Sequence, residues 1–337
     1  MNVSIRGHGV AALCCARLLS RAGFVAQRQV AVRTAAVPAI LLGAAGLALL
    51  RDVLGLPALF ADRPRVIRRM VSWGGGDPVA FPHDAVVVSG DELDAALRAD
   101  IAPASESTAD LTIHTAAPFP AGGLRHFGAR RGQVARVAYL HEEDAMSCWM
   151  EAVAAGWLFC IPAGTGAGWL LAVGATPESL LGQSRHLGSR IALLPDASPA
   201  AGVAGFDTHP RILDALQGPD WLACGTAAVA FDPICGDGTA QAVREAILAA
   251  AAVAAIRDGQ PAEAVRLHHE SMLIAAMRRH LKLCGEFYLK GGKGEWWQAQ
   301  LAALVEGHDW CSRRLAPRPP PRYALQGYRL VPCEKAA

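Results

Sequence analysis

The residues best suited to binding an electron-rich group lie in a glycine-rich turn near residue 236. Residues 221–224 are apolar and end at Gly225, as a buried strand would, and the turn-forming residues up to Thr239 precede an alanine-rich segment that predicts a helix. The unpaired N–H groups and the dipole at the start of such a helix favour a ring carbonyl or a phosphate. This stretch therefore predicts a cofactor-binding turn, with a plain glycine-rich connection capped by Thr239 as the alternative.

A second glycine-rich turn lies at the start of the chain. Residues 3–5 predict a short strand that leads into Gly7, Gly9 and Ala12, and residues 12–22 predict a helix that ends at Gly23. This G-x-G-x-x-A spacing between a strand and a helix is the dinucleotide-binding fingerprint. In it Gly7 makes the turn, Gly9 lets a pyrophosphate approach, and Ala12 allows close packing.

The acidic residue that usually holds an adenosine ribose is missing from this fingerprint. It should follow about 20 residues later, but the strand predicted at residues 24–32 contains no carboxylate and is followed by Arg33. Either other groups hold the ribose, with Arg33 contacting a phosphate, or the adenosine end binds loosely.

The other segments predict alternating strands and helices. Strands are predicted at residues 66–73, 78–82, 85–89 and 111–114, and helices at 37–50 and 91–100. Apolar segments at 134–141, 156–161 and 169–173, broken by glycine and proline, are typical of antiparallel strands, and 190–194 predicts one more. Residues 240–257 and 261–284 predict helices, and the proline-rich residues 317–322 predict an extended tail.

Composition argues against several classes of protein. The net charge is +2 and the two signs are mixed, so nucleic-acid binding has no support. The nine cysteines include no C-x-x-C pair and no signal peptide is recognised, so a cytoplasmic location is expected. The apolar run at 37–50 is too short to cross a membrane, which needs about 20 residues. His268, His269 and Glu270 lack the partner spacing of a zinc site, so no metal is expected.

Three blocks of the sequence resemble the FAD-dependent monooxygenase and halogenase superfamily. They are residues 7–12, residues 156–162 (GWLFCIP) and residues 224–246 with the core FDPICGDGTAQAVREAI, and they occur in the order found in that superfamily. Within it, residues 280–288 and 322–332 are most similar to the flavoprotein monooxygenases that mature tryptophylquinone cofactors, including the one that serves quinohaemoprotein amine dehydrogenase.

The resemblance implies an α/β fold with three parts. These are a Rossmann-like FAD-binding domain (residues 1–72, 85–116 and 220–258), an inserted antiparallel-sheet substrate domain (73–84 and 117–219), and a helical C-terminal region with its tail (259–337). The first turn is expected to line the FAD pyrophosphate, residues 225–228 to approach the ribityl chain, and the second turn to face the isoalloxazine. The residues expected to bind FAD are Gly7, Gly9, Ala12, Arg33, Gly225, Thr226, Asp232, Pro233, Gly236, Asp237, Gly238 and Thr239.

The chemistry that the resemblance implies is hydroxylation. Reduced flavin and molecular oxygen form a C4a-hydroperoxide, and the protein must exclude water and supply N–H groups, which the backbone of Gly236, Asp237 and Gly238 could provide. NADH or NADPH is the expected electron donor. A halogenase would need a lysine between flavin and substrate, but the first lysine of the chain is Lys282, and Phe159 replaces the second Trp of the halogenase signature W-x-W-x-I-P. Halogenation is therefore disfavoured.

The expected substrate is a tryptophan side chain within another polypeptide, and the small subunit of quinohaemoprotein amine dehydrogenase is the suspected partner. Trp149, Trp157, Phe159 and Trp169 could form an aromatic wall for the indole, although packing in the core would also account for them. A small-molecule aromatic hydroxylase and a flavin-binding assembly factor without turnover are the alternatives.

Overall fold

A five-stranded sheet places the first glycine-rich turn and the loop that begins at Gly225 at the same end of its strands. The computed structural model describes residues 1–29, 37–98, 109–164, 166–195 and 205–333, and within them this sheet has the order β15-β16-β6-β1-β2. Its strands are β1 (Val3–Arg6), β2 (Ala26–Gln29), β6 (Leu111–His114), β15 (Gln217–Gly218) and β16 (Trp221–Ala223). All neighbours are parallel except β15 and β16. The carboxyl ends of β1, β6 and β16 therefore lie together.

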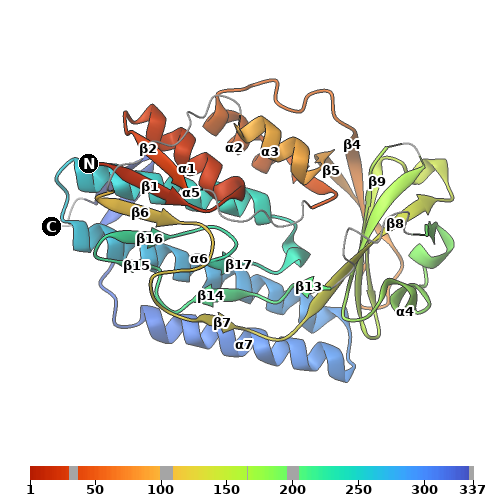
Figure 1. Ribbon diagram of the computed structural model, residues 1–337. Coiled ribbons are helices and arrows are strands. Elements are labelled where there is room, and N and C mark those ends of the chain that lie inside the picture. Colours follow the sequence, from red (N-terminus) through yellow and green to blue (C-terminus); the bar gives the residue numbers. More distant parts are fainter. Residues whose placement is uncertain (30–36, 99–108, 165, 196–204, 334–337) are drawn as a thin grey trace.

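Helices α1 (Gly9–Arg21) and α5 (Gly238–Arg257) follow the two turns and pack against each other beside this sheet (Figure 1). Small side chains let the two backbones approach, so that the Cys15 thiol lies 3.8 Å from the Ala246 carbonyl oxygen. By length and composition α5 could cross a membrane, but 72 % of its most apolar stretch is buried inside the protein. An apolar helix covered in this way is a core helix.

A larger, 9-stranded sheet has the order β12-β8-β11-β10-β9-β4-β5-β3, with β13 paired to β8. Its strands are β3 (Ile40–Gly43), β4 (Arg65–Ser72), β5 (Val79–Val88), β8 (Arg131–Tyr139), β9 (Ser147–Val153), β10 (Gly156–Pro162), β11 (Ala167–Val173), β12 (Ile191–Leu193) and β13 (Phe206–Asp207). The described pairs are antiparallel except β4 with β9. Strands β8 and β9 lie on the side of the molecule away from both termini (Figure 1).

The remaining elements cover or connect these two sheets. Helices α2 (Ala44–Leu54) and α3 (Gly90–Arg98) pack against α1, and α4 (Pro177–Leu181) packs against β10 and β11. A small sheet joins β7 (Leu124–His126), β14 (Arg211–Leu213) and β17 (Val229–Ala230). Short 3₁₀ helices are η1 (Glu142–Asp144), η2 (Leu187–Ser189) and η3 (Pro233–Cys235). Helices α6 (Ala262–Gly291) and α7 (Glu295–Leu315) pair with each other, and the hairpin β18 (Tyr323–Gln326) and β19 (Arg329–Pro332) follows them.

Aromatic side chains fasten the C-terminal helices to the large sheet. The Trp157 indole of β10 donates to the Tyr288 hydroxyl of α6 across 3.1 Å, and the Trp297 indole of α7 donates to the Val153 carbonyl oxygen across 2.9 Å. These three aromatic side chains are buried. Helix α6 is thereby held where its middle can form a wall of the site described below.

Several elements differ from their sequence prediction. Residues 37–50, expected to be helical throughout, contain strand β3 before helix α2, because a continuous apolar run does not distinguish a buried strand from a buried helix. The strands predicted at 78–82 and 85–89 are one strand, β5, in which Pro82 lies beside a register irregularity against β4. Strand β9 is absent from the prediction because Glu151 interrupts its apolar pattern. In the structure this carboxylate is buried, and backbone N–H groups, including that of Leu187, donate hydrogen bonds to it.

The predicted fold class is confirmed: an α/β protein with a Rossmann-like parallel sheet, an antiparallel sheet and a helical C-terminal region. The large sheet pairs β3, β4 and β5 with β8 to β12, so it draws on the ranges expected for both of the first two domains. The boundaries between the domains stay a prediction.

Candidate functional site

The first glycine-rich turn and the loop after β16 meet at Thr115, directly after β6. A Cβ atom on Gly7, whose φ is +135°, would collide with the Thr115 hydroxyl, and one on Gly225, with φ +83°, would lie 2.9 Å from the Ala11 Cβ. Ala12, on the next turn of α1, is completely buried. Glycine and alanine are needed here because the segments approach too closely for larger side chains.

Gly9, at the start of α1, has a different environment. Its φ is +81°, and an added Cβ would meet no atom of the described residues within 4 Å. The described residues thus leave room beside Gly9 at the N-terminus of α1, where the first N–H groups of a helix suit the negative charge of a pyrophosphate. Thr226 is exposed on the loop after β16. Arg33, the other expected phosphate contact, lies outside the described residues.

The second glycine-rich turn is built as the sequence predicts. Asp232 and Pro233 lead into η3, Gly236 adopts φ +63°, and α5 begins at Gly238. An added Cβ on Gly238 would meet no atom of the described residues within 4 Å, so these residues leave room beside the N-terminus of α5 as they do beside that of α1. Both helix N-termini can thus present backbone N–H groups to an electron-rich ligand.

Asp232 does not face open space; it anchors this turn. Its carboxylate accepts hydrogen bonds from Arg130 (2.7 Å), the Tyr288 hydroxyl (3.0 Å) and the Ile234 N–H (3.0 Å). The backbone N–H of Asp232 donates to His280 Nε2 across 2.8 Å. Because Asp232 is buried and its oxygens are used by the protein, it positions the turn and does not offer these oxygens to a ligand.

A cavity of about 770 Å³ lies in front of the second turn. That is within the range of cavities that bind cofactors and small ligands. One wall is the second turn and the first part of α5, and the facing wall is the segment from β3 into α2. The lining residues from these walls include Leu41, Gly43, Gly46, Gly236, Asp237, Thr239 and Gln241, with Arg69 and His83 from the large sheet and His280 from α6.

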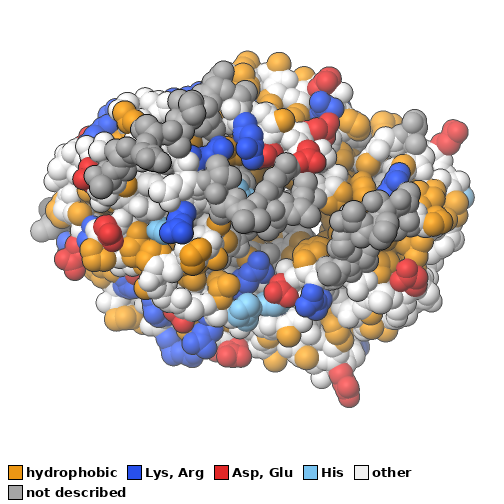
Figure 2. Space-filling view, viewed as in Figure 1, with side chains coloured by type: hydrophobic (Ala, Val, Ile, Leu, Met, Phe, Trp, Pro, Cys, Tyr) orange, Lys and Arg blue, Asp and Glu red, His pale blue; other side chains and the backbone are white. Residues whose placement is uncertain are grey.

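The lining of the cavity is mostly apolar but carries excess positive charge. The charged side chains that line it are Arg69, Arg244 and Arg279 against Asp84 and Asp237. Arg69 lies 3.3 Å from His83 Nε2, and burial, followed by the charge of Arg69, lowers the pKa of His83. A neutral His83 beside Arg69 favours an anionic or electron-rich ligand. Elsewhere on the visible face, acidic and basic side chains are interspersed (Figure 2).

The expected aromatic wall is divided between two faces of the large sheet. Trp157, Phe159 and Trp169 share one face, since Trp169 pairs with Ile161 in the alternating register of β10 and β11. Trp149 lies in the hydrophobic cluster on the opposite face, so it cannot join them. Trp157 is completely buried and its N–H is bound to Tyr288. None of the three lines the 770 Å³ cavity, and their contact with a substrate stays a prediction.

Two buried charged residues at the site are missing from the sequence prediction. Arg130, just before β8, binds Asp232. Glu245 of α5 accepts the Gly225 N–H across 2.6 Å and the Gln241 side-chain amide across 3.2 Å, and burial raises its pKa to about 7. The available signal was the single acid of a mostly apolar, alanine-rich helix, where a buried carboxylate needs an internal donor.

No family model and no curated protein matches the chain, but solved structures are similar to it. The peptidyl tryptophan dihydroxylase QhpG, essential for tryptophylquinone cofactor biogenesis, is 18 % identical over 98 % of this chain and 86 % of its own, with a TM-score of 0.69. The flavin-dependent halogenase CmlS is 16 % identical over 92 % of this chain and 70 % of its own, with a TM-score of 0.72. PqsL, a probable FAD-dependent monooxygenase from Pseudomonas aeruginosa, is 16 % identical over 91 % of this chain and 99 % of its own, with a TM-score of 0.64. The chain therefore has the fold of FAD-dependent monooxygenases and halogenases.

Proposed function

We propose that this protein is an FAD-dependent monooxygenase that hydroxylates a tryptophan side chain in a polypeptide during formation of a tryptophylquinone cofactor. The observation that carries the proposal is the 770 Å³ cavity lined by Gly236, Asp237 and Thr239, together with the room beside Gly9 at the N-terminus of α1 in the described part of the chain. The two sites match two parts of FAD, the flavin ring at one end and the pyrophosphate in the middle.

The residues present fit FAD. The first N–H groups of α1, behind Gly9, would hold the pyrophosphate, and those of α5, behind Gly238, would hold the electron-rich edge of the flavin ring. When bound and reduced by NADH or NADPH, FAD supplies the activation of molecular oxygen. The chain itself would bind and orient FAD and exclude water from it. Apolar residues such as Leu41 and Leu42 line the cavity, and Arg69 places positive charge in it.

The polypeptide substrate is supported by the length of the similarity. The likeness to QhpG, described as a peptidyl tryptophan dihydroxylase, extends over 98 % of this chain and so includes the C-terminal helices. The proposed partner is the small subunit of a quinohaemoprotein amine dehydrogenase, carrying the target tryptophan. We place the reaction in the cytoplasm, where free thiols such as those of this chain stay reduced.

Halogenation is an alternative reaction, because flavin-dependent halogenases have the same fold. A halogenase of this superfamily needs a lysine between the flavin and the substrate, and none of the described residues that line the cavity is a lysine. The first lysine of the chain, Lys282, is exposed on α6. This composition favours hydroxylation. Two further alternatives are a small-molecule aromatic hydroxylase and a flavin-binding assembly factor without turnover. The experiment below distinguishes both from the proposed function.

The test compares three substrates under identical conditions. The protein, FAD, NADH or NADPH, oxygen and bromide are incubated with the precursor polypeptide, free tryptophan or indole, and products are measured by mass spectrometry. We expect one or two added oxygen atoms on the polypeptide tryptophan and none with the Gly238→Leu variant. Hydroxylation of the free compounds alone would indicate a small-molecule hydroxylase. Bromination would indicate a halogenase, and bound FAD without any product would indicate an assembly factor.

A further inference from the structure

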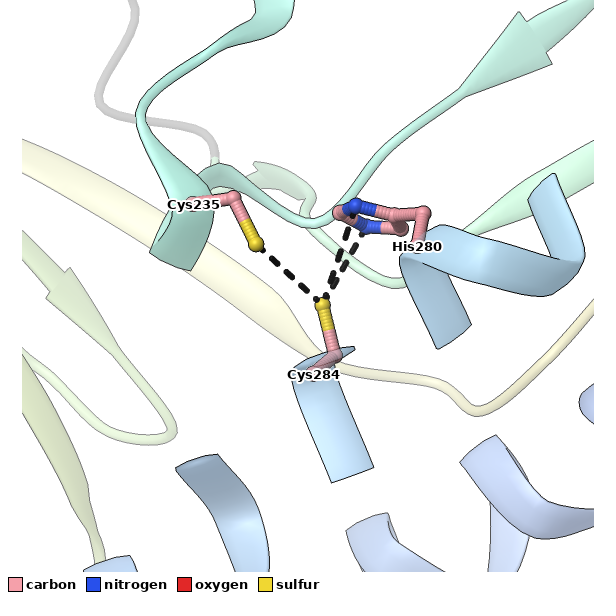
Figure 3. A group of neighbouring side chains, drawn as sticks. All are labelled: Cys235, His280 and Cys284. Carbon is pink, nitrogen blue, oxygen red and sulfur yellow. Dashed lines mark hydrogen bonds between the residues drawn. The ribbon is translucent and has the colours of Figure 1, made fainter. Parts of the chain in front are cut away.

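Two cysteines and a histidine meet at the edge of the cavity (Figure 3). Cys235 ends η3, directly before Gly236, and Cys284 lies on α6 one helical turn after His280. The Cys235 and Cys284 sulfur atoms are 3.7 Å apart, and the Cys284 sulfur lies 3.3 Å from His280 Nε2. The two thiols come from segments 49 residues apart in the sequence.

We propose that Cys235 and Cys284 are a peroxide-reactive thiol pair, in which Cys235 is oxidised from the cavity and Cys284 closes a reversible disulfide with it. The proposal does not rest on the function proposed above, because the reaction needs only a peroxide. An FAD site that reduces oxygen would be a local source of hydrogen peroxide, and this pair would be among the first thiols to meet it.

Access distinguishes this pair from another close pair of thiols. Cys235 is half-buried and lines the cavity, so a small oxidant in the cavity reaches its sulfur, whereas Cys284 is completely buried behind it. Cys15 and Cys224 are also close, with 4.0 Å between their sulfur atoms, but both are completely buried in the core and neither lines the cavity. The distance between the sulfur atoms is similar in the two pairs, but of these two pairs only Cys235 and Cys284 can be reached by an oxidant from the cavity.

The surroundings give the two thiols of the pair different roles. The hydrogen bond from the Cys284 thiol and the contact with His280 lower the pKa of Cys235 to about 6, against the opposing effects of burial and of Asp232. Burial raises the pKa of Cys284. Cys235 is thus a thiolate near neutral pH and the nucleophile, and Cys284 is a protonated neighbour that can attack in the second step.

The chemistry balances with one peroxide. The Cys235 thiolate attacks hydrogen peroxide, the O–O bond breaks, and Cys235 becomes a sulfenic acid while hydroxide leaves and takes up a proton. The Cys284 sulfur then attacks the Cys235 sulfur, the S–O bond breaks, and water leaves with the Cys284 proton. Two thiols and one peroxide give one disulfide and two waters. The sulfur atoms must approach from 3.7 Å to about 2.05 Å, the length of a disulfide bond, which requires a small movement of η3 toward α6.

A metal site is less favoured by the same geometry. His280 Nε2 already accepts the Asp232 N–H across 2.8 Å, and the imidazole stacks on the Phe231 ring at 4.1 Å between centroids. A metal ion bound to Nε2 would have to displace that amide. The nearby Asp232 carboxylate is bound by Arg130, Tyr288 and Ile234, so it is not free to complete the coordination. A structural zinc site needs four ligands.

The test is thiol mapping of the full chain without FAD. Reduced protein is freed of reductant in the presence of a chelator, treated with hydrogen peroxide, denatured with an alkylating reagent and digested with chymotrypsin, which separates Cys224 from Cys235 by cleavage after Phe231. We expect a peptide pair joined through Cys235 and Cys284, two hydrogens lighter than its parts and lost on treatment with a dithiol. Cys15 and Cys224 should stay alkylated, with Cys235 oxidised roughly tenfold faster or more.

Two variants give matched controls. In Cys284→Ser, Cys235 should stop at the sulfenic acid, which a cyclic 1,3-dione traps; in Cys235→Ser, Cys284 should stay reduced. Oxidation of Cys235 no faster than that of Cys224 in the wild-type chain would overturn the proposal without any variant. One zinc ion per chain, retained through the chelator and protecting both thiols from peroxide, would replace it with a metal site.

Discussion

Arg130 and Asp232 form a completely buried ion pair, with 2.7 Å between Arg130 Nη2 and Asp232 Oδ2. The pair joins the start of β8 to the turn that leads to Gly236, and Tyr288 of α6 donates to the same carboxylate oxygen. A buried charge is tolerated only with partners of this kind, because removal from water costs several kcal/mol per ion. The second glycine-rich turn is therefore held by side chains from two distant segments.

Loss of the Asp232 charge should strongly destabilise the protein. Asp232→Asn leaves the Arg130 guanidinium buried without a countercharge, and we expect a loss of about 3–5 kcal/mol in the free energy of unfolding, measured by urea denaturation. Asp237→Asn is the matched control, because Asp237 lies only five residues after Asp232 and pairs with Arg244, and both side chains of this pair are about half exposed. It should cost less than about 1 kcal/mol. Equal effects of the two substitutions would show that the buried pair does not anchor the turn.

Gly9→Val should abolish binding of both FAD and ADP. The added side chain projects into the open space in front of α1, where the pyrophosphate shared by the two ligands is expected. The positive φ also makes valine strained, at about 1–3 kcal/mol. Gly23→Val is the control for this strain, because Gly23 has φ +79° and equally open surroundings at the other end of α1. Titration of each variant with FAD and with ADP checks the prediction, and unchanged affinities for Gly9→Val would remove the assignment.

The two strand–turn–helix units could be predicted because each is local. The apolar strand, the glycine spacing and the helix expected to bind the ligand lie within about 30 residues of one another. The facing wall of the cavity could not be predicted, since residues 41–46 read as part of one apolar helix, whereas residues 41–43 end strand β3 by pairing with β5 and α2 begins only at Ala44.

The residues that support the turns depend on tertiary contacts. Arg130 is 102 residues from Asp232, and nothing in the surrounding sequence indicates that it is buried. The Cys235–Cys284 contact combines a turn with a helix 49 residues away. A partial signal existed for it, since His280 and Cys284 are spaced four residues apart and so share a helix face.

Gly238→Leu should weaken FAD binding more than ADP binding. An added Cβ at Gly238 meets no atom of the described residues within 4 Å, so we expect the fold to be preserved while the rest of the leucine side chain fills space at the start of α5. We expect the dissociation constant for FAD to rise roughly tenfold or more and that for ADP, which lacks the flavin ring, to change little. Gly76→Leu, at an exposed turn away from the cavity, should change neither. If FAD and ADP were weakened equally, the flavin ring would not lie at this turn.

Glu245→Gln should stabilise the protein in a pH-dependent way. Burial raises the pKa of Glu245 from its ordinary 4.5 to about 7, so the folded protein holds a proton that the unfolded chain releases between these values. The wild type therefore loses stability as pH rises from about 4.5 to 7, and the loss is constant above that range. A glutamine still accepts the Gly225 N–H with its carbonyl oxygen, and Gln241 can rotate its amide to match.

The expected gain of Glu245→Gln is near zero at pH 4 and rises to about 3 kcal/mol at pH 8, taking about 1.4 kcal/mol for each pKa unit. Urea denaturation at a series of pH values measures it, and Glu306→Gln, at an exposed position on α7, should leave stability unchanged at every pH. A gain that did not depend on pH would mean that the carboxyl group titrates alike in both states. Loss of stability at all pH values would mean instead that the ionised carboxylate is needed to hold the Gly225 loop, since its 2.6 Å hydrogen bond would then outweigh the cost of burial.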